Sequence, residues 1–236
     1  MKLAIMQPYF LPYPGYFSLV KHTDQFILFD TVQYIRHGWI ERNRILKPDH
    51  GWQYIAVPLE KHSRETLIQD IRIRNSTDWR ETIFSQLEHY KKRAPYYPQA
   101  MEVLRKALDI DTDSLVKLNE QILITVCQYL GIDIKIHIFS EMEIAIEPAG
   151  APDEWALNIC KAIGAVEEYW NPEGGLEFFD RSKYEREGIA IKFLKLRLPE
   201  YSQRRSEFEA GLSMCDLMMF CQPEQINKML EDYVLL

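Results

Sequence analysis

The segment from residue 30 to residue 44 holds most of the side chains in this chain that could do chemistry. It combines two carboxylates, two carboxamides, an imidazole, an indole and three guanidinium groups: Asp30, Gln33, Arg36, His37, Trp39, Glu41, Arg42, Asn43 and Arg44. A guanidinium group binds phosphate or carboxylate through two parallel hydrogen bonds, and an indole offers a face for stacking. The pattern indicates a binding site for an anion, and the alternative is a charged hairpin in which the arginines pair with Asp30 and Glu41.

Three residues of this segment are candidates for catalysis. His37 is its only histidine, and imidazole titrates near neutral pH, so His37 is the first candidate for a general base; it could equally contact a phosphate. Asp30 places a carboxylate directly after an expected strand. Asn43 could orient an acyl carbonyl or stabilise its oxyanion, while Arg42 and Arg44 bind an anionic donor. We expect substitution of Asn43 or Arg44 to impair function and to spare the fold.

A second unusual segment runs from Gln7 to Tyr16 and contains three prolines and three tyrosines. Each proline fixes its own φ angle and restricts the residue before it, so such a loop loses little entropy when a ligand binds. Gln7 and Tyr9 are therefore candidates for substrate binding. The alternative is a structural turn whose aromatic rings pack on the following helix.

A third candidate lies near the carboxyl end, where Tyr201 and Gln203 follow an expected strand. Polar side chains at the end of a buried strand often bind ligands, so both are candidates for substrate binding. The alternative is simple packing of a tyrosine on a loop.

Sequence patterns that announce other chemistries are missing. The histidines show no HxxxH or HExxH spacing, and the chain has no CxxC pair, P-loop, GxGxxG or GxSxG motif, so we expect no metal site. The four cysteines lie in apolar helical contexts and are expected to be reduced, buried thiols. Without a visible nucleophile, direct transfer between two bound substrates is the simplest chemistry.

The elements expected around these residues form an α/β unit. Residues 2–6 and 25–29 are short apolar runs that predict buried strands, and residues 15–22 between them predict a short helix. Two strands joined by a helix are usually parallel, which puts the proline-rich loop at the carboxyl edge of the sheet. We therefore expect one pocket to be lined by side chains from both segments, namely Gln7, Tyr9, Asp30, Gln33, Trp39, Asn43 and Arg44.

The rest of the chain alternates between strand and helix patterns. After a loop over residues 30–50, a β-pair is expected at 52–59 and 66–74, and strands at 132–138, 168–170 and 189–196. Helices are expected at 79–90, 97–108, 114–130, 154–163, 182–187, 212–221 and 223–233. This alternation predicts an α/β fold with a mostly parallel sheet and flanking helices, in one domain over residues 1–236 that a linker could subdivide into 1–147 and 153–236.

Composition narrows the classes of partner. The chain of 236 residues has a formal net charge of −7, which argues against nucleic-acid binding through the overall field. The amino terminus is too short an apolar run for a signal peptide, and no apolar run approaches the roughly 20 residues of a membrane span. We expect a cytoplasmic protein without a membrane span.

The same motifs resemble those of the WbqC-like family. The resemblance rests on Met6-Gln-Pro-Tyr-Phe-Leu-Pro-Tyr-Pro-Gly-Tyr-Phe17, Phe29-Asp-Thr-Val-Gln-Tyr34 and Gly38-Trp-Ile-Glu-Arg-Asn-Arg-Ile45, and continues through Ala94-Pro-Tyr-Tyr97, Ile159-Cys-Lys-Ala-Ile-Gly-Ala165, Pro199-Glu-Tyr-Ser-Gln203 and Leu212-Ser-Met-Cys-Asp216. It implies an acyl or aminoacyl transferase, with glycine as one candidate group, acting on an amino sugar or sugar nucleotide in bacterial polysaccharide or O-antigen synthesis. The implied donor is a thioester of coenzyme A or of an acyl carrier protein, with no tightly bound cofactor.

Two positions depart from the family pattern. Asp30-Thr31 stands where paired aspartates are common, which leaves one carboxylate, and Glu41 stands where asparagine is frequent, which could change the substrate. A fainter resemblance links residues 5–19 to nucleotidyltransferase-like domains such as pantothenate synthetase, with Tyr13-Pro-Gly-Tyr16 in the place of HxGH. It implies the fold of the first strand–loop–helix–strand unit. Two alternative functions stay open: a nucleotide-handling enzyme, and a non-catalytic module that binds a sugar nucleotide or a carrier.

Overall fold

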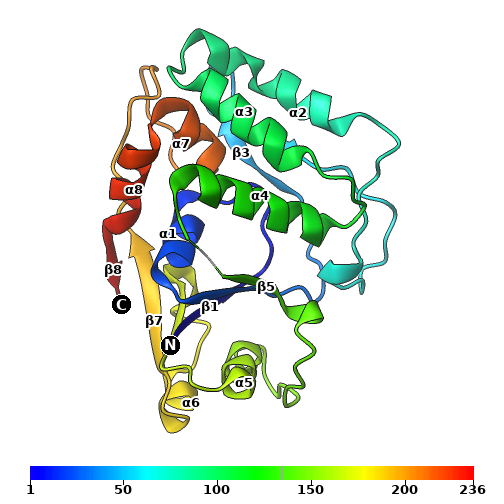
Figure 1. The fold of residues 1–236 in the computed structure, drawn as a ribbon, viewed down its shortest axis with the longest axis vertical. Helices are drawn as coiled ribbons and strands as arrows, with labels where there is room; N and C mark the ends of the chain where they lie inside the picture. Colours follow the sequence, from blue (N-terminus) through cyan, green and yellow to red (C-terminus); the bar gives the residue numbers. More distant parts are fainter. Residues whose placement is uncertain (134) are drawn as a thin grey trace.

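The computed structural model describes residues 1–133 and 135–236 and contains a six-stranded, mostly parallel sheet (Figure 1). The strand order is β5-β2-β1-β6-β7-β8, in which β8 alone is antiparallel to its neighbour. The bounds are β1 (Lys2–Met6), β2 (Gln25–Leu28), β5 (Ile136–Ile138), β6 (Glu168–Pro172), β7 (Ala190–Leu196) and β8 (Tyr233–Leu235). The expected α/β class, with a mostly parallel sheet and flanking helices, is confirmed.

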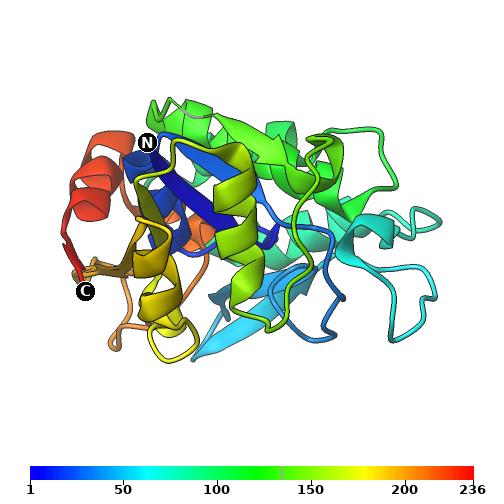
Figure 2. The ribbon, with the colours of Figure 1, turned by 90° about the horizontal axis from the view of Figure 1, so that it is seen from below.

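Helices cover both faces of this sheet because its strands carry apolar side chains on both sides. Ala4 and Phe26 face a large core with α1 (Pro14–His22), α2 (Trp79–Leu87), α3 (Tyr97–Leu108), α4 (Leu115–Leu130), α7 (Met214–Phe220) and α8 (Pro223–Glu231). Leu3 and Ile27, their neighbours along each strand, face a second core with α5 (Glu154–Ile163) and α6 (Arg181–Arg186). Figure 2 shows α5 lying across that second face. Burial on both faces explains why these strands are continuous apolar runs.

Local capping sets several helix boundaries where the sequence predicts them. The Asp78 side chain accepts a hydrogen bond from the Glu81 backbone N–H at the start of α2, and Ser114 accepts one from Lys117 at the start of α4. Gly131 ends α4 with a φ of 67°, in the left-handed region that glycine adopts without strain. Within the described residues there are also four short 3-10 helices: η1 (Ile68–Asp70), η2 (Glu88–Lys92), η3 (Phe139–Glu141) and η4 (Glu173–Gly175).

The expected pairing of residues 52–59 with residues 66–74 is wrong. Its first strand is present as β4 (Trp52–Ala56), but β4 pairs antiparallel with β3 (Arg42–Leu46), which lies inside the expected loop over residues 30–50. Residues 66–74 form η1 and isolated bridges to Gln33, Leu59 and Ser114 instead of a strand. Ile68, Ile71 and Ile73 are nevertheless buried in the core. The apolar pattern of this segment therefore indicated which side chains are buried, but not that the segment pairs as a β-strand.

Two further strand and helix boundaries differ from expectation. The strand expected at 132–138 is reduced to β5, and Ile134 lies outside the described residues. The last helix ends at Glu231 instead of residue 233, and Tyr233 begins β8, which pairs with β7. Strands from before and after the 147–152 linker belong to one sheet, because Lys2 of β1 pairs with Glu168 of β6. Among the described residues, none of the helices has the length and apolar character needed to cross a membrane.

Candidate functional site

The proline-rich loop and the segment after β2 lie side by side. The Phe10 backbone N–H donates to the Trp39 carbonyl at 2.8 Å, and the Met214 N–H donates to the Pro12 carbonyl at 2.8 Å. Both segments leave the carboxyl ends of adjacent parallel strands, as the β1–α1–β2 unit predicts. Their proximity is therefore confirmed, and their use as one binding site stays a prediction.

Two buried asparagines hold the proline-rich loop in place. The Asn43 Nδ2 group donates to the Phe10 and Leu11 carbonyls at 3.1 and 2.9 Å, and its Oδ1 accepts from the Arg44 N–H at 2.8 Å. The Asn119 Nδ2 group donates to the carbonyls of Pro8 and Ile40 at 2.8 and 2.9 Å. Asn43 is 3% exposed, so the expectation that its side chain lies free in a pocket is wrong. Its carboxamide is committed to satisfying buried backbone groups.

Asp30 is also engaged in a structural contact. It is 1% exposed, and its two carboxylate oxygens accept from the Ser140 backbone N–H at 3.0 Å and the Ser140 hydroxyl at 2.6 Å. Burial raises the pKa of this carboxyl above its ordinary value, although the Ser140 hydrogen bonds oppose the shift. Asp30 therefore fastens the end of β2 to the segment after β5. Gln33 is exposed nearby and donates to the Arg64 carbonyl at 2.6 Å.

His37 lies at the tip of an exposed turn that Glu41 organises. Its backbone has a φ of 63°, and its N–H donates to the Glu41 carboxylate at 3.1 Å. The His37 carbonyl accepts from the Arg42 guanidinium at 2.5 Å. Glu41 is only 8% exposed, so the residue that departs from the family pattern is a buried support of this turn. His37 is exposed to solvent, and its catalytic role stays a prediction.

Five half-buried side chains form what we call the aromatic–arginine layer, defined as Trp39, Arg42, Arg44, Trp52 and Tyr54. The Arg44 guanidinium carbon lies 4.1 Å from the centre of the Trp52 ring and 5.1 Å from that of Trp39, and the Arg42 carbon lies 4.0 Å from that of Tyr54. The Trp52 and Tyr54 rings meet edge to face at 4.9 Å. The layer thus presents two guanidinium groups on three aromatic rings.

The pairing of β3 with β4 explains why these residues share one face. Side chains alternate along a strand, so Arg42 and Arg44 point to the face opposite Asn43 and Ile45, which are buried. Register places Arg44 opposite Tyr54, so the rings of β4 lie under the arginines of β3. Sequence reasoning missed Trp52 and Tyr54, although Arg-x-Arg followed by Trp-x-Tyr is the signal that an antiparallel pair would have revealed.

The two arginines of the layer have no carboxylate within ion-pair distance among the described residues. Arg42 donates only to backbone carbonyls, those of His37 and Gly38. The Arg44 Nε atom is buried and has no hydrogen-bond partner. The charged-hairpin alternative, in which Asp30 and Glu41 neutralise these arginines, is therefore wrong. An uncompensated guanidinium group between two indoles suits an anionic ligand with an aromatic part.

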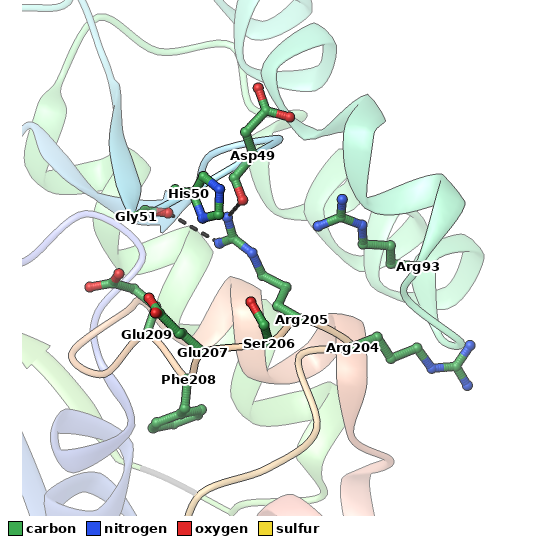
Figure 3. Close-up of a pocket in the computed structure, with 10 residues that line it drawn as sticks. All are labelled: Asp49, His50, Gly51, Arg93, Arg204, Arg205, Ser206, Glu207, Phe208 and Glu209. Atoms are coloured by element: carbon green, nitrogen blue, oxygen red, sulfur yellow. Dashed lines mark hydrogen bonds between the residues drawn. The ribbon is translucent and has the colours of Figure 1, made fainter.

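Two adjoining cavities open at the turn of the β3–β4 hairpin. One has a volume of about 630 Å³ and is lined by Lys47, Gly51, Trp52, Gln53, Tyr54 and Glu209. The other has a volume of about 330 Å³ and lies between the hairpin turn, Arg93 and residues 204–209 (Figure 3). They share Gly51 and Glu209, and the first is also lined by Trp52 and Tyr54 of the aromatic–arginine layer. The sequence could not have predicted that these segments lie together, because they come from distant parts of the chain.

Tyr201 and Gln203 lie beneath this region in a buried hydrogen-bond network around Asp216. The Tyr201 hydroxyl, the Tyr90 hydroxyl and the Gln203 Nε2 group donate to the Asp216 carboxylate at 2.5, 2.6 and 3.1 Å. Burial raises the pKa of Asp216 to about 6, because desolvation outweighs the three hydrogen bonds. The alternative of structural packing therefore describes Tyr201 and Gln203 better than substrate contact. Their network fixes the start of the loop that lines the second cavity.

The proline-rich loop closes over the amino-terminal end of α1. The Tyr16 hydroxyl donates to the Gln7 carbonyl at 2.9 Å, and the Tyr9 and Tyr16 rings lie 5.6 Å apart. A Cβ atom on Gly15 would lie 2.4 Å from the Tyr13 ring, so that ring covers the start of the helix directly. Gln7 and Tyr9 are half-buried, and neither lines the two cavities. Trp39 and Arg44 line neither of these cavities either, so the single pocket expected for both segments stays a prediction.

All four cysteines are free and buried, as the sequence predicts. Burial raises the pKa of the Cys127 and Cys160 thiols to about 12 and that of Cys221 to about 11, and it raises that of Cys215 as well. A thiolate is the nucleophilic form of cysteine, so these residues are poor candidates for a covalent intermediate.

Comparison with known proteins gives a family and one relative. The family model described as "WbqC-like protein family" matches residues 7–228. A Mycobacterium tuberculosis protein named "Uncharacterized protein Rv1507c" is 29% identical over 225 residues, which cover 92% of each chain. No solved structure matches.

Proposed function

Because the chain belongs to the WbqC-like protein family, we propose that it transfers an acyl or aminoacyl group, such as glycyl, to the amino group of a sugar or sugar nucleotide in bacterial polysaccharide or O-antigen synthesis. The donor is an activated thioester. The aromatic–arginine layer binds the nucleotide part of one substrate, either the donor coenzyme A or the nucleotide-linked sugar.

One observation carries this proposal: the Arg44 guanidinium lies between two indole rings and has no acidic partner among the described residues. A nucleotide diphosphate offers both groups that such a layer recognises, a flat base for the rings and phosphate oxygens for the guanidinium. Coenzyme A and sugar nucleotides share this chemistry. A simple free amino acid would leave the aromatic faces unused.

The buried thiols favour direct transfer over an acyl-enzyme. In direct transfer the amine nitrogen of the sugar attacks the thioester carbonyl, the new C–N bond forms, the C–S bond breaks, and the amine proton is transferred to the departing thiolate. The chain must then bind both substrates in contact and need not supply a nucleophile. His37 is the candidate to relay the proton, since it is exposed and its backbone carbonyl accepts a hydrogen bond from Arg42 of the layer.

The layer is tested by replacing Arg44 with glutamine. We expect Arg44→Gln to weaken binding of coenzyme A or of a nucleotide-linked amino sugar by a factor of about ten to a hundred, because a charged hydrogen bond contributes about 1.5–3 kcal/mol. Isothermal titration calorimetry measures this loss. Arg105→Gln is the matched control, since Arg105 also stacks on a ring, at 4.2 Å from Phe84, but lies in α3. Equal affinities of Arg44→Gln and wild type would contradict the proposal.

Transfer itself is tested with an acyl or glycyl thioester and a nucleotide-linked amino sugar. Mass spectrometry should detect the amide product together with one equivalent of free thiol. Binding of both substrates without product would favour a non-catalytic binding module. Stabilisation by ATP with magnesium alone, with release of pyrophosphate, would favour the nucleotide-handling alternative; the Tyr13 ring over the start of α1 argues against that outcome, because it covers the helix end that would bind phosphate.

A further inference from the structure

The second cavity at the hairpin turn is lined by two arginines, Arg93 and Arg205, that come from different parts of the chain. Arg205 donates to the backbone carbonyls of Asp49 and Gly51, which ties the loop at 204–209 to the turn between β3 and β4. Figure 3 shows the Arg93 guanidinium directed from the end of η2 toward this clamp, whereas Arg204 points away from it. The space between Arg93 and Arg205 is therefore bounded by guanidinium groups from two distant parts of the chain.

These guanidinium groups keep an uncompensated positive charge. Three carboxylates line the same cavity, those of Asp49, Glu207 and Glu209, yet none lies within ion-pair distance of Arg93 or Arg205. In Figure 3 the Asp49 carboxylate points away from Arg205, and the two glutamates lie on the far side of Arg205 from Arg93. Among the described residues the Arg93 side chain has no hydrogen-bond partner either.

A half-buried histidine, His89, lies near these two arginines. The Nδ1 atom of His89 lies 2.8 Å from the Gln86 carbonyl and so carries its proton, while the buried Nε2 atom has no partner. Burial lowers the pKa of this imidazole, the hydrogen bond to the Gln86 carbonyl opposes that shift, and the charges of Arg205 and Arg93 add to it. Two cations without an ion-pair partner favour an anion in the same place, and the nearby imidazole would sense its binding.

We infer that the cavity between Arg93 and Arg205 is a subsite for a phosphate monoester of a nucleotide-linked substrate. The inference rests on the proposed function and specifies which class of thioester donor the protein uses. The cavity adjoins the aromatic–arginine layer through Gly51 and Glu209, so a nucleotide on the layer can extend a second phosphate into it. Free coenzyme A carries such a monoester on its ribose, whereas a thioester on a carrier protein and an ordinary sugar nucleotide do not. The subsite thus assigns the donor to the coenzyme A class.

The test compares coenzyme A with 3′-dephospho-coenzyme A by calorimetry. We expect wild-type protein to bind the dephosphorylated form more weakly by a factor of about ten to a hundred, and Arg93→Gln to bind both forms alike at the weaker level. Lys92→Gln is the matched control, because it removes the same charge from the adjacent, exposed residue, which does not line the cavity. Lys92→Gln should keep the preference for coenzyme A. Equal binding of the two ligands by wild type would overturn the inference, as would loss of the preference in both variants.

A second measurement separates failure of the subsite from failure of the proposed function. Inorganic phosphate is titrated into the protein while nuclear magnetic resonance follows the His89 imidazole, whose pKa should rise when an anion binds between Arg93 and Arg205. If phosphate raises it in wild type and Lys92→Gln but not in Arg93→Gln, the subsite stands even if no transfer is found. If phosphate leaves it unchanged, the subsite is wrong, whatever the transfer assay shows.

Discussion

Replacing Asn43 with alanine should destabilise the fold rather than remove a catalytic group. Three hydrogen bonds would be lost, two to the carbonyls of Phe10 and Leu11 and one from the Arg44 N–H, and all lie in a region where Asn43 is 3% exposed. At about 1 kcal/mol for each bond, the free energy of unfolding should fall by about 3 kcal/mol. For a chain of this size that corresponds to a melting temperature lower by about 6–12 °C.

Thermal and urea denaturation followed by circular dichroism measure this loss. Arg36→Ala is the matched control, because Arg36 is exposed in the same segment and its removal should change the free energy of unfolding by no more than about 0.5 kcal/mol. If Asn43→Ala melted within about 2 °C of wild type and yet lost ligand affinity, the carboxamide would act on a substrate, and its assignment as a support of the proline-rich loop would be wrong.

Two further predictions concern buried groups. Because the pKa of Asp216 is raised from 3.8 to about 6, its contribution to stability is present below about pH 4 and is lost as pH rises through 6. At 1.36 kcal/mol per pKa unit, the free energy of unfolding of Asp216→Asn relative to wild type should increase by about 3 kcal/mol between about pH 4 and pH 7, and a pH-independent difference in urea denaturation would contradict the assigned cause. The four buried cysteines should resist an aromatic disulfide reagent in the folded protein near neutral pH and react readily in denaturant; rapid labelling of the folded protein would show that a thiol is accessible.

The parallel core was predictable because burial on both faces leaves a direct mark in the sequence. Short apolar runs at β1 and β2, separated by prolines and a short helix, could hardly form anything other than a parallel unit. The hairpin was not predictable in the same way. One face of β3 carries Arg42 and Arg44, which are covered by rings of β4 and not by the core, so the strand shows no apolar alternation.

The candidate site could be predicted only in part, for a similar reason. The arginines and Trp39 stood out by their chemistry, and parallel topology correctly placed them beside the proline-rich loop. Whether a polar side chain is free or committed to a buried contact depends on tertiary partners. Asn43 and Asp30 were therefore placed in the right region, but their hydrogen bonds to the proline-rich loop and to Ser140 could not be read from the sequence.

The central position of β1 has a consequence for the order in which this chain can fold. On one side β1 pairs with β2, where Leu3 meets Gln25 after a short loop and helix; on the other it pairs with β6, where Lys2 meets Glu168. Closing the second pairing costs far more chain entropy, so folding should begin with β1, α1 and β2 and finish slowly when β6 docks. A nascent or truncated chain that ends before β6 would leave one edge of β1, a strand buried at Leu3, Ala4 and Ile5, unpaired. Such an edge is a template for intermolecular pairing, so shortened forms of this protein should aggregate.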